Sequence, residues 1–328
     1  MMTTKAGKLL DELIVVILLA MFAWAQSWAQ APRPKRAYEL TAYSQKFWGL
    51  VGHHTQLATM GTGFGFTEGP VWDQSGFLWV SDEILNKIFK LYPDGHREEI
   101  IALGDPDGNT YDHGHNLIDC ASVLRAIIRL SPDGHSYTVI ADHYDGKRFN
   151  SPNDVVLGPD GAFYFTDPTL DLPKGQAQEI PFQGVYRVDN SGKVTLIEKD
   201  QTQPNGLAFS PDGKFLYVDD TKEKNIWVYE FHPDGTASDG RILGSEAGAR
   251  GEGVPDGMRL DKHGNLFVVG PKGIWVWSAS GEHLGTIVLP EQPANLSWGG
   301  KDYSTLYIAA TTSVYTLKTR TRGFVPYK

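Results

Sequence analysis

Apolar residues recur along the chain in short runs that alternate with polar ones, as in half-buried β-strands. Six of these runs follow an oxygen-bearing side chain at one corresponding position, and the spacings between these markers are 39, 46, 52, 51 and 39 residues. The markers are Glu68, Asp107, Asn153, Asn205, Asp256 and Asn295. A repeat of 40–50 residues that holds several short strands is typical of a β-propeller. The pattern therefore predicts an all-β fold, a six-bladed β-propeller.

The fourth repeat shows the expected unit most clearly. Its first strand covers 205–209, a Pro-Asp-Gly turn follows at 211–213, and the second strand covers 215–219. A third strand at 225–231 and a fourth near 241–243 complete the blade. If every marker starts the innermost strand of its blade, the six marker side chains face one another around the central channel.

The first residues of the chain differ from the repeats. Lys5 and Lys8 precede an apolar run at 13–25, and small residues then stand at 27 and 29. These features predict a secretory signal peptide that is cleaved after Ala29, and hence a periplasmic or secreted protein. The apolar run is short for a bilayer span, so we expect no stable membrane insertion after cleavage. An uncleaved membrane anchor is the alternative.

These observations divide the chain into three parts. We predict a signal peptide at 1–29, a loose N-terminal lead-in at 30–52, and a single propeller domain at 53–328. A strand-like stretch near 54–64 is expected to pair into the last blade. That pairing would close the ring and leave fewer exposed sheet edges.

The composition narrows the possible partners. The formal net charge is -9 and the chain contains no basic run, which argues against nucleic acid. The single cysteine, Cys120, excludes an intramolecular disulfide. Because Cys120 lies in a strand-like run, a buried structural thiol is favoured over a reactive one. We expect a small-molecule partner, and a monomer or a small homo-oligomer.

Three of the six markers are carboxylates and three are amides. Taken singly, Asn and Asp also suit turns, and for Asn295 a structural role is favoured. Several carboxylates that face one channel repel one another unless a cation lies between them. We therefore predict a divalent metal site at the channel mouth, built from Glu68, Asn153, Asn205 and Asp256. The sequence lacks a Cys/His cluster with zinc spacing, which favours Ca²⁺, with Zn²⁺ and Mg²⁺ as alternatives.

Longer motifs carry a family resemblance over residues from about 62 to 323. They are FTEGPVW at 66–72, GKRFNSPNDVV at 146–156, FTDP at 165–168, GVYR at 184–187, PNGLAFSPD at 204–212, PDGM at 255–258 and GEHLGTI at 281–287. On these motifs the chain resembles the family of senescence marker protein (regucalcin), gluconolactonase and luciferin-regenerating enzyme. The resemblance implies a six-bladed propeller with one divalent cation at the channel mouth. It implies ligation by Glu68, Asn205 and Asp256, with Asn153 beside them as a ligand or a substrate contact.

The second repeat departs from the pattern of the family it resembles. The family usually has Asn-Gly at this marker, and this chain has Asp107 followed by Gly108. Many gluconolactonase-like members show Cys followed by Glu or Gln and then His, whereas Cys120 is followed by Ala121 and Ser122. His113 and His115 either substitute for the missing histidine or are solvated loop residues. We expect the substrate preference of this protein to differ from that of the family at this blade.

The resemblance implies hydrolysis of sugar lactones, or of organophosphate esters as in some relatives. A cation at the ring would polarise the lactone carbonyl. We assign Asp256 as the base that activates water and the Asn153 amide as a group that helps to stabilise the oxyanion. Arg148 either orients a polyol or carboxylate or forms a surface salt bridge. The leading hypothesis is a metal-dependent sugar lactonase. The alternatives are a phosphotriesterase or aryl-ester hydrolase on the same cation, and a non-enzymatic binding propeller.

Overall fold

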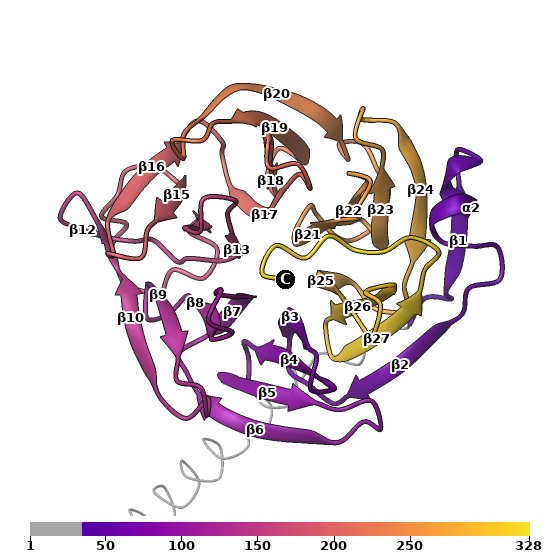
Figure 1. The fold of residues 1–328 in the computed structure, drawn as a ribbon, viewed down its shortest axis with the longest axis horizontal. Helices are drawn as coiled ribbons and strands as arrows, with labels where there is room; N and C mark the ends of the chain where they lie inside the picture. Colours follow the sequence, from indigo (N-terminus) through magenta and orange to yellow (C-terminus); the bar gives the residue numbers. More distant parts are fainter. Residues whose placement is uncertain (1–34) are drawn as a thin grey trace, which may run out of the picture. The chain divides into compact units, whose positions relative to one another are not determined.

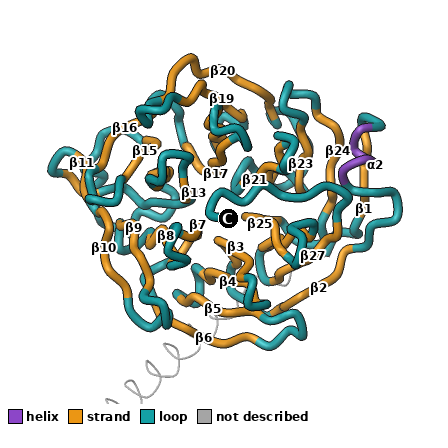
Figure 2. Tube along the Cα trace, viewed as in Figure 1, coloured by secondary structure: helices purple, strands orange, loops and turns teal. Residues whose placement is uncertain are grey.

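Six β-sheets surround a central channel in the computed structural model, which describes residues 35–328 (Figure 1). The chain builds the sheets one after another, and each blade begins at the channel and proceeds outward (Figure 2). This arrangement confirms the predicted six-bladed propeller. The predicted signal peptide at 1–29 lies outside the described residues and stays a prediction.

The first three blades come from the first half of the chain. From the channel outward, blade 1 consists of β3 (Thr67–Asp73), β4 (Phe77–Asp82), β5 (Lys87–Leu91) and β6 (Arg97–Ala102). Blade 2 consists of β7 (Pro106–Tyr111), β8 (Leu117–Ala121), β9 (Ala126–Leu130) and β10 (Tyr137–Ala141). A hairpin of β11 (His143–Tyr144) and β12 (Lys147–Arg148) precedes blade 3, which consists of β13 (Val155–Leu157), β14 (Phe163–Asp167), β15 (Gly184–Val188) and β16 (Val194–Glu198).

The remaining blades follow the same plan, with N-terminal strands added to the last two. Blade 4 consists of β17 (Pro204–Phe209), β18 (Phe215–Asp220), β19 (Asn225–Phe231) and β20 (Ala237–Ser245). Blade 5 consists of β21 (Met258–Leu260), β22 (Leu266–Gly270), β23 (Gly273–Trp277), β24 (His283–Val288) and, at its outer edge, β1 (Glu39–Ala42). Blade 6 consists of β25 (Pro293–Gly299), β26 (Thr305–Ala310), β27 (Ser313–Lys318) and the outermost β2 (Leu57–Thr62).

The ring is closed by a strand from the N-terminal part of the chain. Strand β2 pairs antiparallel with β27, in a register that runs from Leu57 opposite Leu317 to Thr62 opposite Ser313. The predicted closure by the stretch near 54–64 is therefore confirmed. In blade 6, backbone hydrogen bonds therefore join a strand from the beginning of the propeller domain, β2, to its last strand, β27.

The segment that we expected to be a loose lead-in, 30–52, is ordered where the structure describes it. Strand β1 pairs with β24, and the short helix α2 (Lys46–Leu50) follows it. Phe47 and Val51 are fully buried in a core cluster with residues of blades 5 and 6. The segment is too short to show a hydrophobic period, so the sequence pattern did not indicate this docking. Within residues 35–328, no helix has the length and apolar character needed to cross a bilayer.

Apolar side chains between neighbouring blades form the core. Cys120 on β8 is fully buried in a cluster with Ile127 of its own blade and Phe163 and Phe165 of blade 3. This confirms the expected burial of the thiol. Burial, followed by the charges of nearby carboxyl groups, raises the pKa of Cys120 well above its ordinary value. A protonated, inaccessible thiol of this kind contributes packing rather than reactivity.

The last residues of the chain lie across the end of the channel (Figure 1). Tyr327 packs edge-on against Tyr111 at the end of β7, with the ring centroids 5.3 Å apart. Residues 324–327 also line a cavity of about 30 Å³ with Pro70, Val71 and Trp298, large enough for about one water molecule. Because Asp107 lies near the start of β7 and Tyr111 at its end, the tail covers the end of the channel remote from the markers.

Candidate metal and active site

The six markers lie where the innermost strands begin. Glu68, Asp107 and Asn205 are the second residues of β3, β7 and β17, Asn295 is the third of β25, and Asn153 and Asp256 stand two residues before β13 and β21. Four of these strands have a register shift at or beside the marker. A β-bulge bends a strand and redirects its side chains. The bulges therefore take the marker side chains out of the regular ladder.

The glycine after a marker allows neighbouring inner strands to approach closely. A Cβ atom at Gly69 would lie 2.1 Å from the Asp107 carbonyl oxygen, and one at Gly206 would lie 2.1 Å from the Asp256 carbonyl oxygen. Gly69 also has a φ of 50°, which a side chain would strain. The marker–glycine pairs are therefore not simple turn signals. They bring the starts of adjacent inner strands together and so build the ring.

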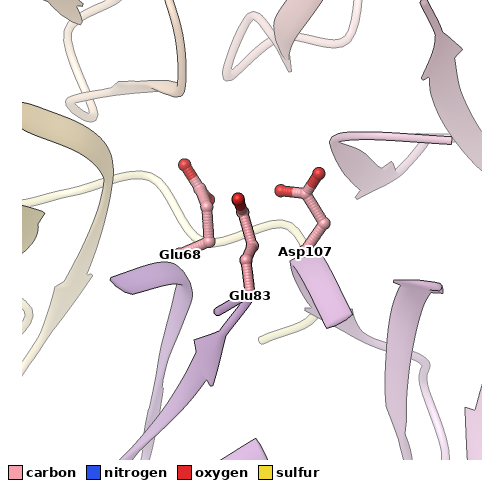
Figure 3. Close-up of side chains that lie close together, drawn as sticks. All are labelled: Glu68, Glu83 and Asp107. Carbon is pink, nitrogen blue, oxygen red and sulfur yellow. The ribbon is translucent and has the colours of Figure 1, made fainter. Parts of the chain in front are cut away.

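Three carboxyl groups converge at the mouth of the channel. Glu68, Glu83 and Asp107 each place one carboxylate oxygen within 4.8 Å of those of the other two. Figure 3 shows the three side chains next to one another, with their carboxyl groups extending to the same side. Glu68 and Asp107 are buried, with 3% and 1% of their surface exposed, and Glu83 is partly exposed. Oxygen atoms suit hard divalent cations, and Glu68 is the member of this cluster that also belongs to the predicted ligand set.

Hydrogen bonds fix the two buried carboxylates. Glu68 Oε2 accepts from the Gly69 backbone N–H at 2.6 Å and from Asn295 Nδ2 at 2.8 Å. Asp107 Oδ2 accepts from Asn153 Nδ2 at 2.7 Å and from the Ser122 hydroxyl at 3.2 Å. The Asn295 amide thus holds Glu68, in line with the structural role favoured for it. Ser122, where the family resemblance led us to expect histidine, lies between Asp107 and the Pro152 carbonyl oxygen, and its shorter contact, at 2.6 Å, is with Pro152.

Asn205 presents an oxygen without a partner. The residue is 3% exposed, its Nδ2 donates to the Thr221 hydroxyl at 3.1 Å, and its Oδ1 is buried with no hydrogen-bond partner. Thr221 in turn donates to the Pro255 carbonyl oxygen at 2.8 Å and so links Asn205 to the chain beside Asp256. A buried carbonyl oxygen left unsatisfied costs about 1–3 kcal/mol. A cation ligand is the role that this oxygen fits, as predicted from the sequence.

The charges of the ring are poorly compensated within the protein. Burial raises the pKa of Glu68 to about 8. Burial, with neighbouring carboxyl groups as a further cause, raises the pKa of Glu83, Asp107 and Asp256 well above the ordinary values. Arg259 is near Glu68, but its Nη1 is bound to Asp154 Oδ2 at 3.2 Å. A divalent cation in the ring would favour the ionised carboxylates, so the donor set fits such an ion.

The structure does not bring all the candidate residues to the ring. The Arg148 guanidinium donates to the Leu124 carbonyl oxygen at 2.7 Å, on the hairpin before blade 3. His115 stacks on Tyr111, and its Nε2 is 3.2 Å from Asp73 Oδ2, at the ends of β7 and β3 remote from their markers. His115 is therefore not a substitute for the missing second-blade histidine. His113 also follows the remote end of β7.

The sequence reasoning missed Glu83 and two further carboxyl groups. Asp105 and Asp171 both interact electrostatically with Glu83 and Asp107. In an antiparallel hairpin the end of the second strand lies beside the start of the first. The register pairs Thr67 of β3 with Asp82 of β4, so the next residue, Glu83, lies at the ring. A predicted hairpin of β3 and β4 would therefore have placed Glu83 beside Glu68 at the ring.

Comparisons with known proteins fit this geometry. The family model for the SMP-30/gluconolactonase/LRE-like region matches residues 66–312. The chain belongs to this family. It is 34% identical to a gluconolactonase of Zymomonas mobilis, with 96% of this chain and 97% of the relative covered. It is 30% identical to a 6-deoxy-6-sulfogluconolactonase of Pseudomonas putida over 52% of this chain and 58% of that protein.

A solved structure agrees with the fold and the family. The gluconolactonase XC5397 of Xanthomonas campestris superimposes with a TM-score of 0.80 at 29% identity, covering 87% of this chain and 96% of that one. The motifs on which the resemblance was based and the whole-chain comparisons therefore lead to the same family. The markers Glu68, Asp107, Asn153, Asn205, Asp256 and Asn295 all lie within the matched region.

Proposed function

We propose that this protein is a lactonase that opens a sugar lactone with the help of one divalent cation bound at the channel mouth. The observation that carries the proposal is the ring of buried carboxylate and amide oxygens, above all the partnerless Oδ1 of Asn205. The similarity to a gluconolactonase over nearly the full length of both chains supports an aldonolactone as the substrate class.

The cation would be held by oxygen atoms of Glu68, Asn205 and Asp256. Asn153 would add its Oδ1, since its amide nitrogen donates to Asp107 and the residue is also hydrogen-bonded to Asp171. We propose Ca²⁺ as the resident ion, because oxygen-only ligand sets suit it best. When bound, the cation supplies Lewis-acid polarisation of the substrate carbonyl and stabilises the charge that develops there.

The residues of the chain supply the proton transfer. Asp256 would hold the attacking water and take one of its protons while the water oxygen bonds to the carbonyl carbon. The bond between that carbon and the ring oxygen then breaks. Asp256 returns the proton to the departing oxygen, so the product is an open-chain hydroxy acid. Asp256 is partly exposed at the ring, which suits contact with both solvent and substrate.

The test is a metal panel combined with a substrate panel. Protein stripped with a chelator is reloaded separately with Ca²⁺, Mg²⁺, Mn²⁺ or Zn²⁺. Acid release is then followed from glucono-1,5-lactone, other aldonolactones, an aryl ester and an organophosphate. We expect turnover of aldonolactones that requires the added cation. Turnover of the organophosphate or aryl ester alone would favour the alternative hydrolase. If no substrate is turned over with any ion, the enzyme proposal is wrong and a binding propeller takes its place.

A further inference from the structure

We propose that the channel mouth selects neutral polyhydroxy lactones and rejects lactones that carry a phosphate, a sulfonate or a second carboxylate, and that Glu83 is a residue that determines this specificity. The inference rests on the proposed lactonase function and adds the charge of the substrate to it. Three observations support it: the direction of the amide groups, the number of carboxyl groups, and the partners of the arginines.

The amide nitrogens around the ring are already used by the protein. Asn153 Nδ2 donates to Asp107, Asn295 Nδ2 donates to Glu68, and Asn205 Nδ2 donates to the Thr221 hydroxyl. What these side chains leave without a partner is oxygen, since the Oδ1 atom of Asn205 is buried and unsatisfied. The mouth therefore offers acceptors to a ligand.

The ring also holds more carboxyl groups than one divalent cation can neutralise. Glu68, Asp107 and Asp256 belong to the inner strands, and Glu83 joins Glu68 and Asp107 within 4.8 Å. Asp105 and Asp171 are close enough to interact electrostatically with Glu83 and Asp107. Two of the negative charges would be balanced by one divalent cation. The remaining carboxyl groups belong to blade 1 (Glu83), blade 2 (Asp105 and Asp107) and the β14–β15 connection of blade 3 (Asp171).

The arginines near these blades are bound to other groups. Arg259 is paired with Asp154 at 3.2 Å, and Arg148 donates to the Leu124 carbonyl oxygen at 2.7 Å. The buried Arg125 donates through Nε to the Phe149 carbonyl oxygen at 2.5 Å. Arg259 is near enough to Glu68 to lower the pKa of that carboxyl group, but its Nη1 is engaged by Asp154 and by the Met258 carbonyl oxygen. An anionic substituent would therefore meet acceptors and like charges.

A sugar hydroxyl is suited to this surface, because it donates a hydrogen bond to a carboxylate and accepts one from a carboxylic acid. A phosphate or sulfonate only accepts from donors at neutral pH, and it is repelled by those carboxyl groups that are ionised in the cation-loaded ring. Glu83 is the most accessible member of the Glu68, Glu83 and Asp107 cluster, since it is partly exposed at the end of β4. It is therefore the member best placed to meet a substituent on the substrate.

Binding selectivity tests the inference without requiring turnover. Calorimetry on the Ca²⁺-loaded protein compares 1,5-anhydroglucitol, a neutral ring that cannot be hydrolysed, with its 6-phosphate. We expect the wild type to bind the neutral ring at least about tenfold more tightly, and Glu83→Gln to reduce that ratio by about tenfold. Glu98→Gln, the same substitution on the outer strand β6 of the same blade, should leave the ratio unchanged.

Asp105→Asn provides a second variant, which should reduce the ratio in the same direction. Ca²⁺ titration and thermal melting are measured for each variant. A weakening of Ca²⁺ affinity by more than about tenfold in Glu83→Gln would make Glu83 a metal ligand and overturn its assigned role. Equal or tighter binding of the 6-phosphate by the wild type, or no binding of either ring, would overturn the selectivity. Kinetics with glucono-1,5-lactone and its 6-phospho and 6-deoxy-6-sulfo forms then report on the lactonase function separately.

Discussion

Asp256 combines a position at the ring with an unusual electrostatic environment. Burial, followed by the charges of Glu68 and Asp154, raises the pKa of Asp256 well above its ordinary value. A bound divalent cation would act in the opposite direction and favour the carboxylate. The same residue is thus able to ligate an ion and to hold a water molecule whose proton it accepts.

Asp256→Asn tests this role. The amide keeps the shape and one ligand oxygen but cannot accept the proton, so we expect kcat to fall by at least about 10³-fold. Circular dichroism and thermal melting should show a folded protein, since the change is nearly isosteric. The matched control is Asp239→Asn, an exposed residue on β20, which should retain full activity. Full activity in Asp256→Asn would remove Asp256 from the proton-transfer step.

The pH dependence of stability follows from Glu68. Its pKa is raised from 4.5 to about 8 in the folded protein, mainly by burial. Between these pH values the folded, metal-free protein binds more protons than the unfolded chain. The free energy of unfolding is therefore highest below about pH 4.5 and falls as the pH rises towards 8. We expect a loss of at least about 2 kcal/mol over this window.

Denaturant titrations at several pH values in the presence of a chelator measure this loss. The same series in saturating Ca²⁺ is the control, and there the decline should be much smaller because the cation favours the ionised ring. A chelated protein whose stability stays constant or rises between these pH values would contradict the assignment of Glu68 as a poorly compensated buried carboxyl group.

At the scale of single elements, the start of each inner strand carries a marker, which is joined by a bulge in four blades and followed by a glycine in four. Gly206 on β17 is a clear case, because its φ is not in the left-handed region and only the close approach of the next blade requires glycine there. Its would-be Cβ lies 2.1 Å from a backbone oxygen of Asp256, an atom that cannot move aside like a flexible side chain. The element therefore positions Asn205 and Asp256 together.

We predict that Gly206→Ala destabilises the protein by about 2–4 kcal/mol and weakens Ca²⁺ binding, because Asn205 and Asp256 are pushed apart. Gly49→Ala is the matched control. Gly49 lies in α2, is exposed, and has no atom within 4 Å of a would-be Cβ, so alanine there should be neutral or stabilising by up to about 1 kcal/mol. Equal melting temperatures and Ca²⁺ affinities for the two variants would contradict the close-approach argument.

Sequence periodicity predicts what repeats and misses what occurs once. The inner strands, the markers and the closing strand β2 were predictable because a spacing of 40–50 residues identifies corresponding positions in every blade. Glu83 was missed because its place depends on hairpin register rather than on the repeat. The direction of the Asn153 amide, which donates to Asp107, depends on side-chain rotamers that no sequence pattern encodes. The docking of Phe47 involves too short a segment to be periodic.

At the scale of the whole molecule, the N-terminal segment completes two blades. Strand β2 is the outermost strand of blade 6, and β1 lies at the outer edge of blade 5, with α2 between them in sequence. The bonds that join the ends of the propeller run through β2 and β27. Because the proposed metal ligands Glu68, Asn153, Asn205 and Asp256 come from four different blades, the ring geometry depends on this closure.

Graded N-terminal truncation tests this dependence. A chain that starts at Gln30, the first residue after the predicted cleavage site, should be fully stable. A chain that starts at Tyr43 lacks only β1 at an outer edge, and should lose about 1–3 kcal/mol while it retains Ca²⁺ binding. A chain that starts at Gly63 also lacks α2 and β2, so it exposes β27 as a free edge and removes the buried Phe47 and Met60. We expect this third chain to aggregate or to melt without a cooperative transition, and to lose Ca²⁺ binding. If it folds cooperatively and binds Ca²⁺ as tightly as the first, closure by β2 does not maintain the ring, and the inner strands alone must hold the ligands in place.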